Sequence, residues 1–241
     1  MKISFCTPVC NRLYQLIETF DHNCKVISEN KDTEWIILNF ASHDGLHDFM
    51  MSRLNKISTR IVYAKDTSNR IWHMSSGKNS AHAVASGNVL VNMDCDNYID
   101  PNVDIIKTKF QSGTQILRTW TGIYGDGTCG RVSIDKDSFY KLGGYDENFY
   151  PAGYQDIDIF KRAIALKLRH DVHVSTDYKA IKNDKIETIK NTGMSNIPYK
   201  FMNEENEEMS KHNIKNKILK VNLPHGFFMP KVEIFKGKLD C

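Results

Sequence analysis

The sequence lacks any long apolar run and any excess of charge of one sign. No stretch approaches the roughly 20 uncharged apolar residues that span a bilayer, and Met1-Lys2 leads directly into the strand-like ISFCTPV instead of a signal-peptide core. The 32 Lys and Arg residues nearly balance the 29 Asp and Glu residues, so the formal net charge of +3 does not by itself indicate a nucleic-acid or anionic-membrane partner. These absences predict a cytoplasmic protein without a transmembrane segment.

Cysteine pairs with metal-site spacing are also missing. The 6 cysteines are scattered without a C-x-x-C pair, which disfavours a zinc site. A chain of 241 residues, 41% of them hydrophobic, can bury one substantial core and does not need disulfides to hold it together. We therefore expect free thiols, most of them buried.

The first half of the sequence alternates apolar runs with segments of helical spacing. Strands are expected at 3–9, 35–38, 59–64 and 89–93, and helices at 13–20, 46–54 and 76–86. This order is typical of an open α/β sheet, in which ligands gather at the carboxyl ends of the strands.

The second half changes this pattern. Two strands at 115–124 and 130–134, joined by a glycine-rich turn, and a helix at 156–167 predict mixed strand pairing. From Tyr178 onward the chain is polar, with the acidic run 204–208 followed by several lysines. This last segment is expected to form a solvated surface helix or a loosely ordered tail.

Three short motifs resemble ligand-binding signatures but fail on their context. The glycines at 125, 127 and 130 have the spacing of a dinucleotide fingerprint, yet a strand-like segment follows them instead of the required helix. The run at 77–80 lacks the first glycine of a P-loop, because position 72 is tryptophan. The segment 94–105 begins like a calcium loop but lacks its glycine and its final glutamate.

Two groups of carboxylates have a more favourable context. Asp94 and Asp96 follow the most hydrophobic strand, and residues two apart in an extended segment project to the same side, so both can bind one hard cation together with a diphosphate. Asp156 and Asp158 begin an amphipathic helix, where the helix N-terminus favours the ionised form, and Gly153 before them would let a substrate approach the backbone. Ordinary helix capping by Asp156 is the competing interpretation.

Together these segments resemble a known family. Three blocks are similar to GT-A-fold, nucleotide-sugar-dependent, inverting glycosyltransferases: TPVCNR, SGKNSAHAVASGNVLVNMDCDN and GRVSIDKDSFYKLGGYDENFYPAGYQDIDIFKR. The second half most resembles the carboxyl-terminal module of β-1,4-galactosyltransferases and of bacterial chondroitin-type polymerases. The resemblance extends over roughly residues 3–165. It implies an α/β protein of the GT-A fold, with a Rossmann-like mixed sheet flanked by helices.

The resemblance also implies a domain organisation. A GT-A catalytic domain is expected over 1–175, with a nucleotide- and metal-binding half at 1–100 and an acceptor half at 101–175. The polar extension 176–241 is expected to pack on this domain.

Individual roles follow from the resemblance. Asp94 and Asp96 correspond to the family's D-x-D, which binds Mn²⁺ or Mg²⁺, with Asp96 as the more direct ligand, and Asp156 corresponds to the general base. The residues expected against the nucleotide are Pro8, Val9, Arg12, Asn39, Lys78 and Asp94. The residues expected against the acceptor, in a segment that moves as a lid in relatives, are Tyr150, Gly153, Tyr154, Gln155 and Asp158.

The chain departs from the family pattern at three places. Gln155 replaces the glutamate before the base, which removes a charge from the acceptor side, and Asn39 stands where an acidic residue usually faces the base or ribose. The histidine that often completes the metal site is Asn183 here, followed by Asp184, with His225 as a more distant candidate. The third metal ligand is therefore unassigned.

The activity implied by the resemblance is metal-dependent, inverting transfer of a sugar from a nucleotide diphosphate, expected to be UDP, to a hydroxyl of a saccharide. A nucleic-acid acceptor such as a hydroxymethylated base stays open because of the lysines beyond Lys179. A nucleotide-sugar-binding protein that has lost catalysis also stays open because of Gln155 and Asn39. A nucleotidyltransferase is disfavoured, because TPVCNR stands where that class has a glycine-rich basic loop.

Overall fold

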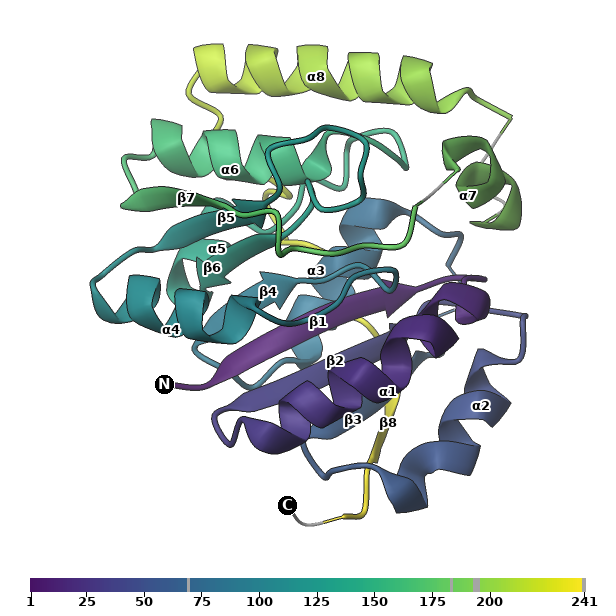
Figure 1. Cartoon of the computed structure of the whole chain (residues 1–241). Coiled ribbons are helices and arrows are strands. Elements are labelled where there is room, and N and C mark those ends of the chain that lie inside the picture. Colours follow the sequence, from purple (N-terminus) through teal and green to yellow (C-terminus); the bar gives the residue numbers. More distant parts are fainter. Residues whose placement is uncertain (69, 183, 193–195, 240–241) are drawn as a thin grey trace.

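The computed structural model describes residues 1–68, 70–182, 184–192 and 196–239, which form one sheet with helices on both faces (Figure 1). The strands are β1 Ile3–Val9, β2 Thr33–Asn39, β3 Ile61–Asp66, β4 Val89–Asn92, β5 Ile116–Trp120, β6 Val132–Asp135, β7 His170–Val174 and β8 Val232–Lys236. The helices are α1 Leu13–Glu29, α2 Leu46–Arg53, a 3-10 turn Leu54–Lys56, α3 Met74–Val84, α4 Asn102–Gln111, α5 Lys136–Leu142, α6 Gln155–Ala165, α7 Lys185–Thr192 and α8 Tyr199–Lys215.

The strands lie in the order β7-β5-β6-β4-β1-β2-β3-β8. The neighbours β4, β1, β2 and β3 are parallel, whereas β6 is antiparallel to β4 and β5, and β8 is antiparallel to β3. The sheet is therefore mixed, and the predicted fold class is confirmed. Because Cys6 pairs with Asn92, the carboxyl ends of β1 and β4 lie side by side.

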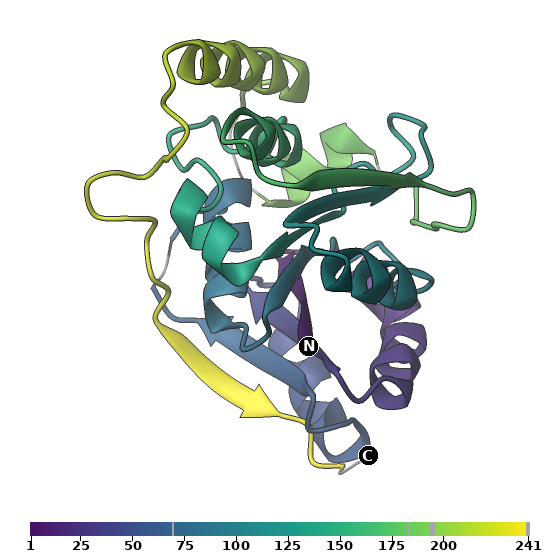
Figure 2. The same cartoon turned by 90° about the vertical axis from the view of Figure 1, so that its left-hand side faces the viewer.

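Helices lie on both faces of the sheet (Figure 2), and an apolar cluster fills the space on each side. One packs α1, α2 and α4 against the strands, with Leu16 and Ile106 among its members. The other packs α3, α5 and α6 on the opposite face, with Phe139 and Ile159 among its members. β1 and β2 are buried along their whole length, as expected for strands covered on both faces.

The alternation in the first half of the sequence predicts β1 to β4 and α1 to α3 correctly. The sequence analysis missed α4, α5, β7 and β8. The helices α4 and α5 are short, and β7 is an edge strand whose residues alternate between exposed and half-buried, so none of the three has a long apolar stripe. The expected strand 115–124 ends at Trp120, where the chain turns.

The expectations about thiols and membrane spans can be examined over most of the chain. The described cysteines are free thiols: Cys6, Cys10, Cys24, Cys95 and Cys129. Cys241 lies outside the described residues. Within the described ranges, no helix has both the length and the apolar character needed to cross a membrane.

Helix α8 is more firmly packed than a solvated helix or a loose tail would be. It lies along α6 at one end of the molecule (Figure 1). Met202, Asn206 and Ser210 recur every fourth residue and are each 0% exposed. β8 adds a further strand to the sheet beside β3. The polar C-terminal segment is therefore not a loose tail: one row of α8 is buried against the protein, and β8 pairs with β3, while their other sides are exposed.

Asn206 ties α8 to the loop that precedes α6. Its Nδ2 lies 3.1, 3.2 and 2.8 Å from the carbonyl oxygens of Tyr150, Ala152 and Gly153. The backbone N–H of Tyr150 donates to Asn206 Oδ1 at 2.7 Å. Buried backbone groups need such partners, because an unpaired one costs free energy. One side chain on α8 therefore fixes the conformation of 150–153.

We predict that Asn206→Ala lowers the free energy of unfolding by about 1–3 kcal/mol, because it leaves buried backbone groups of the loop unpaired. The same variant should speed hydrogen exchange of the Tyr150 amide, which loses its acceptor. Chemical denaturation and amide exchange measure the two effects. Asn213→Ala is the matched control on α8, since Asn213 makes only a 3.4 Å contact with Asp146. Unchanged exchange at Tyr150 would contradict the assignment.

Candidate active site

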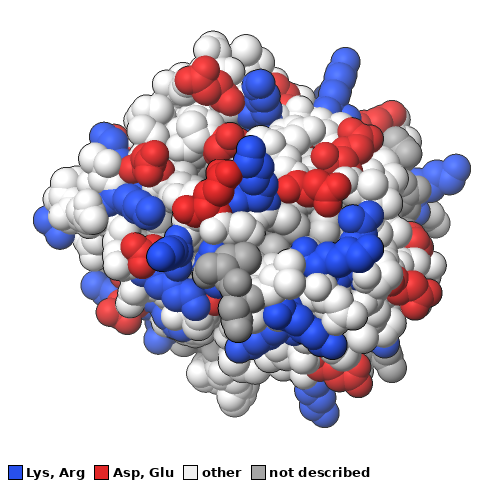
Figure 3. Space-filling model, turned by 60° about the horizontal axis from the view of Figure 1, so that its bottom comes forward, with Lys and Arg blue, Asp and Glu red and all other residues white. Residues whose placement is uncertain are grey.

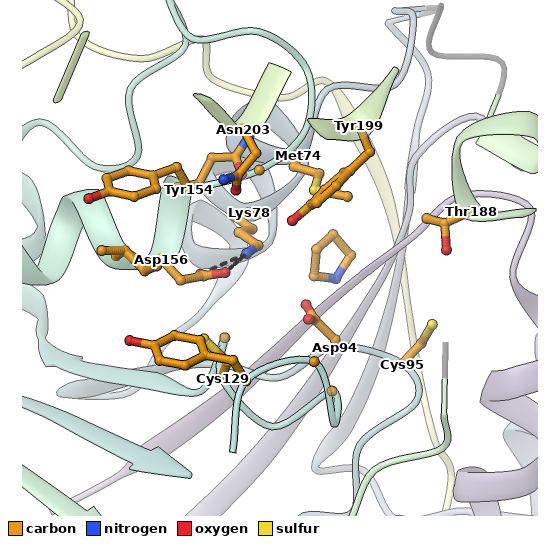
Figure 4. A pocket seen from close by; sticks show the side chains of 18 of the residues that line it. Met74, Lys78, Asp94, Cys95, Cys129, Tyr154, Asp156, Thr188, Tyr199 and Asn203 are labelled. Carbon is orange, nitrogen blue, oxygen red and sulfur yellow. Dashed lines mark hydrogen bonds and ion pairs between the residues drawn. The ribbon is translucent and has the colours of Figure 1, made fainter. Parts of the chain in front are cut away.

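A cavity of about 720 Å³ opens where the carboxyl ends of β1 and β4 meet α3 and α6. The turn between β5 and β6 and one face of α8 complete its walls. Figure 4 shows side chains from these separate elements pointing into the same space. Ligands bind at this edge in open α/β sheets, so the cavity lies where the topology predicts a site.

The cavity collects most of the residues that the resemblance assigns to the site. Those that line it are Pro8, Arg12, Lys78, Asp94, Gly153, Tyr154, Gln155 and Asp156. Those that do not line it are Val9, Asn39, Asp96, Tyr150 and Asp158. The fold thus brings together residues from both halves of the chain. The five expected residues that do not line the cavity lie elsewhere in the structure.

The two D-x-D carboxylates have different surroundings. Asp94 lines the cavity, whereas Asp96 is 1% exposed. Asp96 accepts hydrogen bonds from Arg12 Nη2 at 3.1 Å and from Asn97 Nδ2 at 2.5 Å. Burial lowers the pKa of Arg12, but electrostatic interactions with Cys95 and Asp96 raise it by more. The pKa of Arg12 is therefore raised overall. Asp96 is therefore a carboxylate that a permanent cation already holds in place.

Asp156 is the second residue of α6. The N-cap of α6 is Tyr154, which has a positive φ of 69° and makes no capping bond with its side chain. Ordinary helix capping therefore does not account for Asp156. Its carboxylate instead points into the cavity toward Lys78 (Figure 4).

Lys78 forms a bidentate ion pair with Asp156. Lys78 Nζ lies 2.7 and 2.6 Å from the two carboxylate oxygens. Burial lowers the pKa of Lys78, but Asp156 and Asp94 outweigh burial and raise it overall, so the ammonium stays charged. Burial is also the main cause of a raised pKa at Asp156, which Lys78 opposes. Sequence analysis placed Lys78 against the nucleotide and did not foresee this contact with the expected base.

Asp94 and Asp156 approach each other across Gly130. A Cβ added at Gly130 would lie 2.9 Å from Asp156 Oδ2 and 3.3 Å from Asp94 Oδ2. Asn92 Nδ2 lies 3.5 Å from Asp94 Oδ1 and 3.4 Å from Asp156 Oδ1. The backbone at Gly130 therefore lets the end of β4 and the start of α6 present two carboxylates to one space. A side chain at this position would separate them or block access to them.

Asp158 points away from the cavity, because two residues along a helix correspond to a rotation of about 200°. It is 0% exposed and accepts a hydrogen bond from Arg162 Nε at 2.7 Å. Arg162 also donates to the carbonyl oxygens of Leu142 and Gly144. Asp158 thus anchors α6 to the end of α5. Its side chain therefore lies outside the cavity, away from the acceptor contact that the resemblance implied.

Three residues that were expected at the site do not line the cavity: Asn39, Val9 and Tyr150. Asn39 Nδ2 donates to the Tyr63 hydroxyl at 2.9 Å, and its Oδ1 accepts from the backbone N–H of Ser42 at 2.9 Å. Val9 is fully buried in the cluster under α1. Tyr150 is partly buried and packs against α8. None of the three presents its side chain to the cavity.

Sequence analysis missed the contribution of α8. Tyr199, Asn203 and Glu207 line the cavity at a spacing of four, which was the only signal available in the sequence. Gly153 has a φ of +94°, and a Cβ there would lie 2.7 Å from the Cβ of Asn203. The positive φ and the close packing of Asn203 therefore both require glycine at this position, which also lines the cavity. Further lining residues that the sequence did not indicate are Trp72, Met74, Tyr124, Cys129 and Lys161.

The third metal ligand stays unassigned. Asn183 lies outside the described residues, and His225 is exposed and does not line the cavity. Across the ranges that the structure describes, no three or more His, Cys, Asp or Glu side chains form a group that could hold a metal ion.

Comparison with known proteins gives structural neighbours only. No family model matches the chain, and no curated protein matches it in sequence. TarS from S. aureus in complex with UDP-GlcNAc superposes with a TM-score of 0.68 at 15% identity, over 93% of this chain and 68% of TarS. The mannosyltransferase PcManGT from Pyrobaculum calidifontis, in complex with GDP-Man and Mn²⁺, gives a TM-score of 0.57 at 12% identity, over 88% and 69% of the two chains.

A third neighbour is a galactosyltransferase, as the resemblance implied. A variant of Drosophila β-1,4-galactosyltransferase 7, in complex with manganese, UDP-Gal and xylobiose, gives a TM-score of 0.57 at 13% identity. The match covers 100% of this chain and 94% of that protein. All three neighbours are GT-A glycosyltransferases, and a likeness at such low identity concerns the fold. The chain therefore has the GT-A fold.

Proposed function

We propose that this protein transfers a sugar from a nucleotide diphosphate to an acceptor hydroxyl, with inversion at the anomeric carbon. The observation that carries the proposal is the convergence of Asp94, Asp156 and Lys78 in one cavity at the carboxyl edge of a GT-A sheet. One carboxylate there is suited to the leaving diphosphate and its cation, and the other to the attacking hydroxyl. Such a division of roles is what a displacement with inversion requires.

The donor is proposed to be a UDP-sugar. Two of the three structural neighbours described above are complexes with a UDP-sugar, and the third is a complex with GDP-Man. In this chain Pro8 near the end of β1 and Arg12 just after it line the cavity, where a nucleoside diphosphate would lie beside Asp94. Arg12 provides a permanent positive charge at this position.

The acids of the D-x-D fit a hard divalent cation. Magnesium and manganese accept one or two carboxylates, with water and substrate phosphate oxygens completing the shell. Asp94 faces the cavity, and Asp96, two residues further along, is held in place by Arg12 and Asn97. Asp94 and Asp96 would hold Mn²⁺ or Mg²⁺ at this site. When bound, the ion would neutralise charge on the leaving diphosphate.

Asp156 is proposed to remove the proton from the acceptor hydroxyl. As the hydroxyl oxygen bonds to the anomeric carbon, the bond from that carbon to the diphosphate breaks and the proton passes to Asp156. Lys78 favours the ionised form of Asp156 and fixes the plane of its carboxylate through two short contacts. Gln155, which replaces an acid, places its Nε2 3.4 Å from the carbonyl oxygen of Tyr150, so it supports the acceptor loop.

The competing functions differ in what they need from the cavity. A nucleotide-sugar-binding protein without catalysis would not need a carboxylate directed into the cavity from the start of α6, and Asp156 is present there. A nucleic-acid acceptor would favour a basic surface. On the face that Figure 3 shows, the described Lys and Arg side chains are interspersed with Asp and Glu. These observations favour a catalyst that acts on a saccharide.

Replacing the base gives the first test of this proposal. Asp156→Asn keeps the shape of the side chain and removes its basicity, so we expect sugar transfer to fall at least ~100-fold while UDP affinity changes by a small factor. Transfer from a radiolabelled UDP-sugar and calorimetric UDP binding measure the two quantities. Asp104→Asn is the matched control, because Asp104 is an exposed acid in the first turn of α4. A near-normal transfer rate in Asp156→Asn would refute the role of Asp156.

Removing the metal gives the second test. Excess EDTA should abolish transfer, and added Mn²⁺ or Mg²⁺ should restore it, because the leaving diphosphate needs a compensating charge. Asp96→Ala should nearly abolish the gain in UDP affinity that Mn²⁺ produces, since one remaining carboxylate holds a hard cation poorly. Calorimetry with and without Mn²⁺ measures this gain. Full activity in excess EDTA would show that transfer is metal-independent.

A further inference from the structure

One face of α8 looks into the same cavity as Asp156. Tyr199, Asn203 and Glu207 recur every fourth residue, so their side chains lie in one row along the helix. The adjacent row, Met202, Asn206 and Ser210, is buried and fixes the helix to the rest of the protein. In Figure 4, Tyr199 and Asn203 lie across the cavity from Asp94. We call the row of Tyr199, Asn203 and Glu207 the cavity face of α8.

We propose that the cavity face of α8 is a subsite for a neutral pyranose ring of a saccharide acceptor. This inference rests on the proposed function and names the acceptor class for the same site. A phenol ring offers a flat apolar surface for the C–H face of a sugar and a hydroxyl for its rim. The Asn203 amide can donate and accept, and the Glu207 carboxylate accepts from sugar hydroxyls. Cavities with mostly apolar walls and a few placed polar groups are typical of small-molecule sites.

The subsite borders the reacting groups. Tyr199 and Asp156 line the same cavity, and Figure 4 shows both side chains directed into it. Partial burial raises the pKa of the Tyr199 phenol, and the negative charge of Asp156 raises it further. A sugar that packs on Tyr199 would therefore present a hydroxyl to the base. Asn203 lies over Gly153, in the loop that leads into α6. The cavity face therefore lies on the acceptor side of Asp156, opposite Asp94.

The charges on α8 favour a neutral acceptor over a polyanion. The run 204–208 contains four glutamates and Asn206. Glu207 faces the cavity and pairs with Lys211 at 3.1 Å, and Glu208 shares the same lysine at 2.8 Å. A nucleic acid at this position would bring its phosphates toward the acidic run, which raises the free energy of binding. A saccharide brings only hydroxyls, for which carboxylates are good acceptors.

The experiment compares acceptors and α8 variants in the full chain. The probes are methyl β-glucopyranoside, methyl β-galactopyranoside, methyl β-xylopyranoside and a DNA oligonucleotide containing hydroxymethylcytosine, each with a panel of UDP- and GDP-sugars. Donor hydrolysis by water is measured alongside transfer. The variants are Asn203→Ala, which keeps the Cβ that packs on Gly153, and Glu207→Gln, which keeps the shape of the side chain. Glu204→Gln is the matched control, because Glu204 is 60% exposed and its ion-pair contact is with Lys200 at 3.8 Å.

The expected result is transfer to at least one pyranoside and none to the oligonucleotide. Asn203→Ala and Glu207→Gln should each raise the KM for the pyranoside about tenfold, while the KM for the donor and the rate of donor hydrolysis stay within about twofold. Glu204→Gln should behave as the unchanged protein does. If the two side chains were merely structural, their replacement would lower the melting temperature and the rate of donor hydrolysis together. The KM for the pyranoside would then not rise relative to the KM for the donor.

Two outcomes would overturn the inference alone. One is an unchanged KM for the pyranoside in both variants. The other is donor hydrolysis without transfer to any pyranoside, or with transfer to the oligonucleotide instead. Absence of both hydrolysis and transfer with every nucleotide sugar would refute the proposed function itself, and the subsite with it. Donor hydrolysis in the unmodified chain therefore separates the two kinds of failure.

Discussion

The ion pair between Lys78 and Asp156 is the interaction on which the site depends. Two charges can be buried only if they satisfy each other, because removing a single charge from water costs several kcal/mol. Lys78 is on α3, in the first half of the chain, and Asp156 is on α6, in the second half, with 2.6 Å between their nearest atoms. The cavity floor is therefore complete only when both halves meet, and the end of β4, which carries Asp94, lies at the same junction.

The C-terminal helix α8 forms the wall of the cavity that lies across from Asp94. Asn206 holds the backbone of 150–153, and Asn203 lies where a side chain at Gly153 would have to go. The start of α6, and with it the direction of Asp156, thus depends on a helix beyond the segment that resembles the galactosyltransferase module. The sheet edge forms one wall of the cavity and α8 forms another. Substitutions on α8 would therefore change the binding of the proposed acceptor while Asp94 and Asp96 stay the same.

Local pattern predicted a large part of this arrangement. Buried parallel strands have continuous apolar runs, so the sequence predicted β1 to β4. Their order predicted that Asp94 lies at the edge of the sheet where ligands bind. The sequence indicated two acids at the start of α6, but the partner of each was hidden, because tertiary contacts bring Lys78 to Asp156 and direct Arg162 to Asp158. α8 was misjudged for a related reason. Its buried row contains Asn206 and Ser210, which look like surface residues until the loop carbonyls they meet are known.

The balance of charge around the cavity indicates why a divalent cation suits this site. Asp96 is compensated by Arg12 and Asp156 by Lys78, while burial lowers the pKa of Arg131, the next cation, to about 10. Lys161 lines the cavity and donates to the Tyr154 hydroxyl. A diphosphate that enters would also meet Arg12 and Lys78, whose charges carboxylates already offset, and the negative charge of Asp94. Repulsion between these anions in a partly buried space would oppose binding. A divalent cation held by Asp94 and Asp96 would offset that repulsion and would leave the ion pair of Lys78 and Asp156 intact.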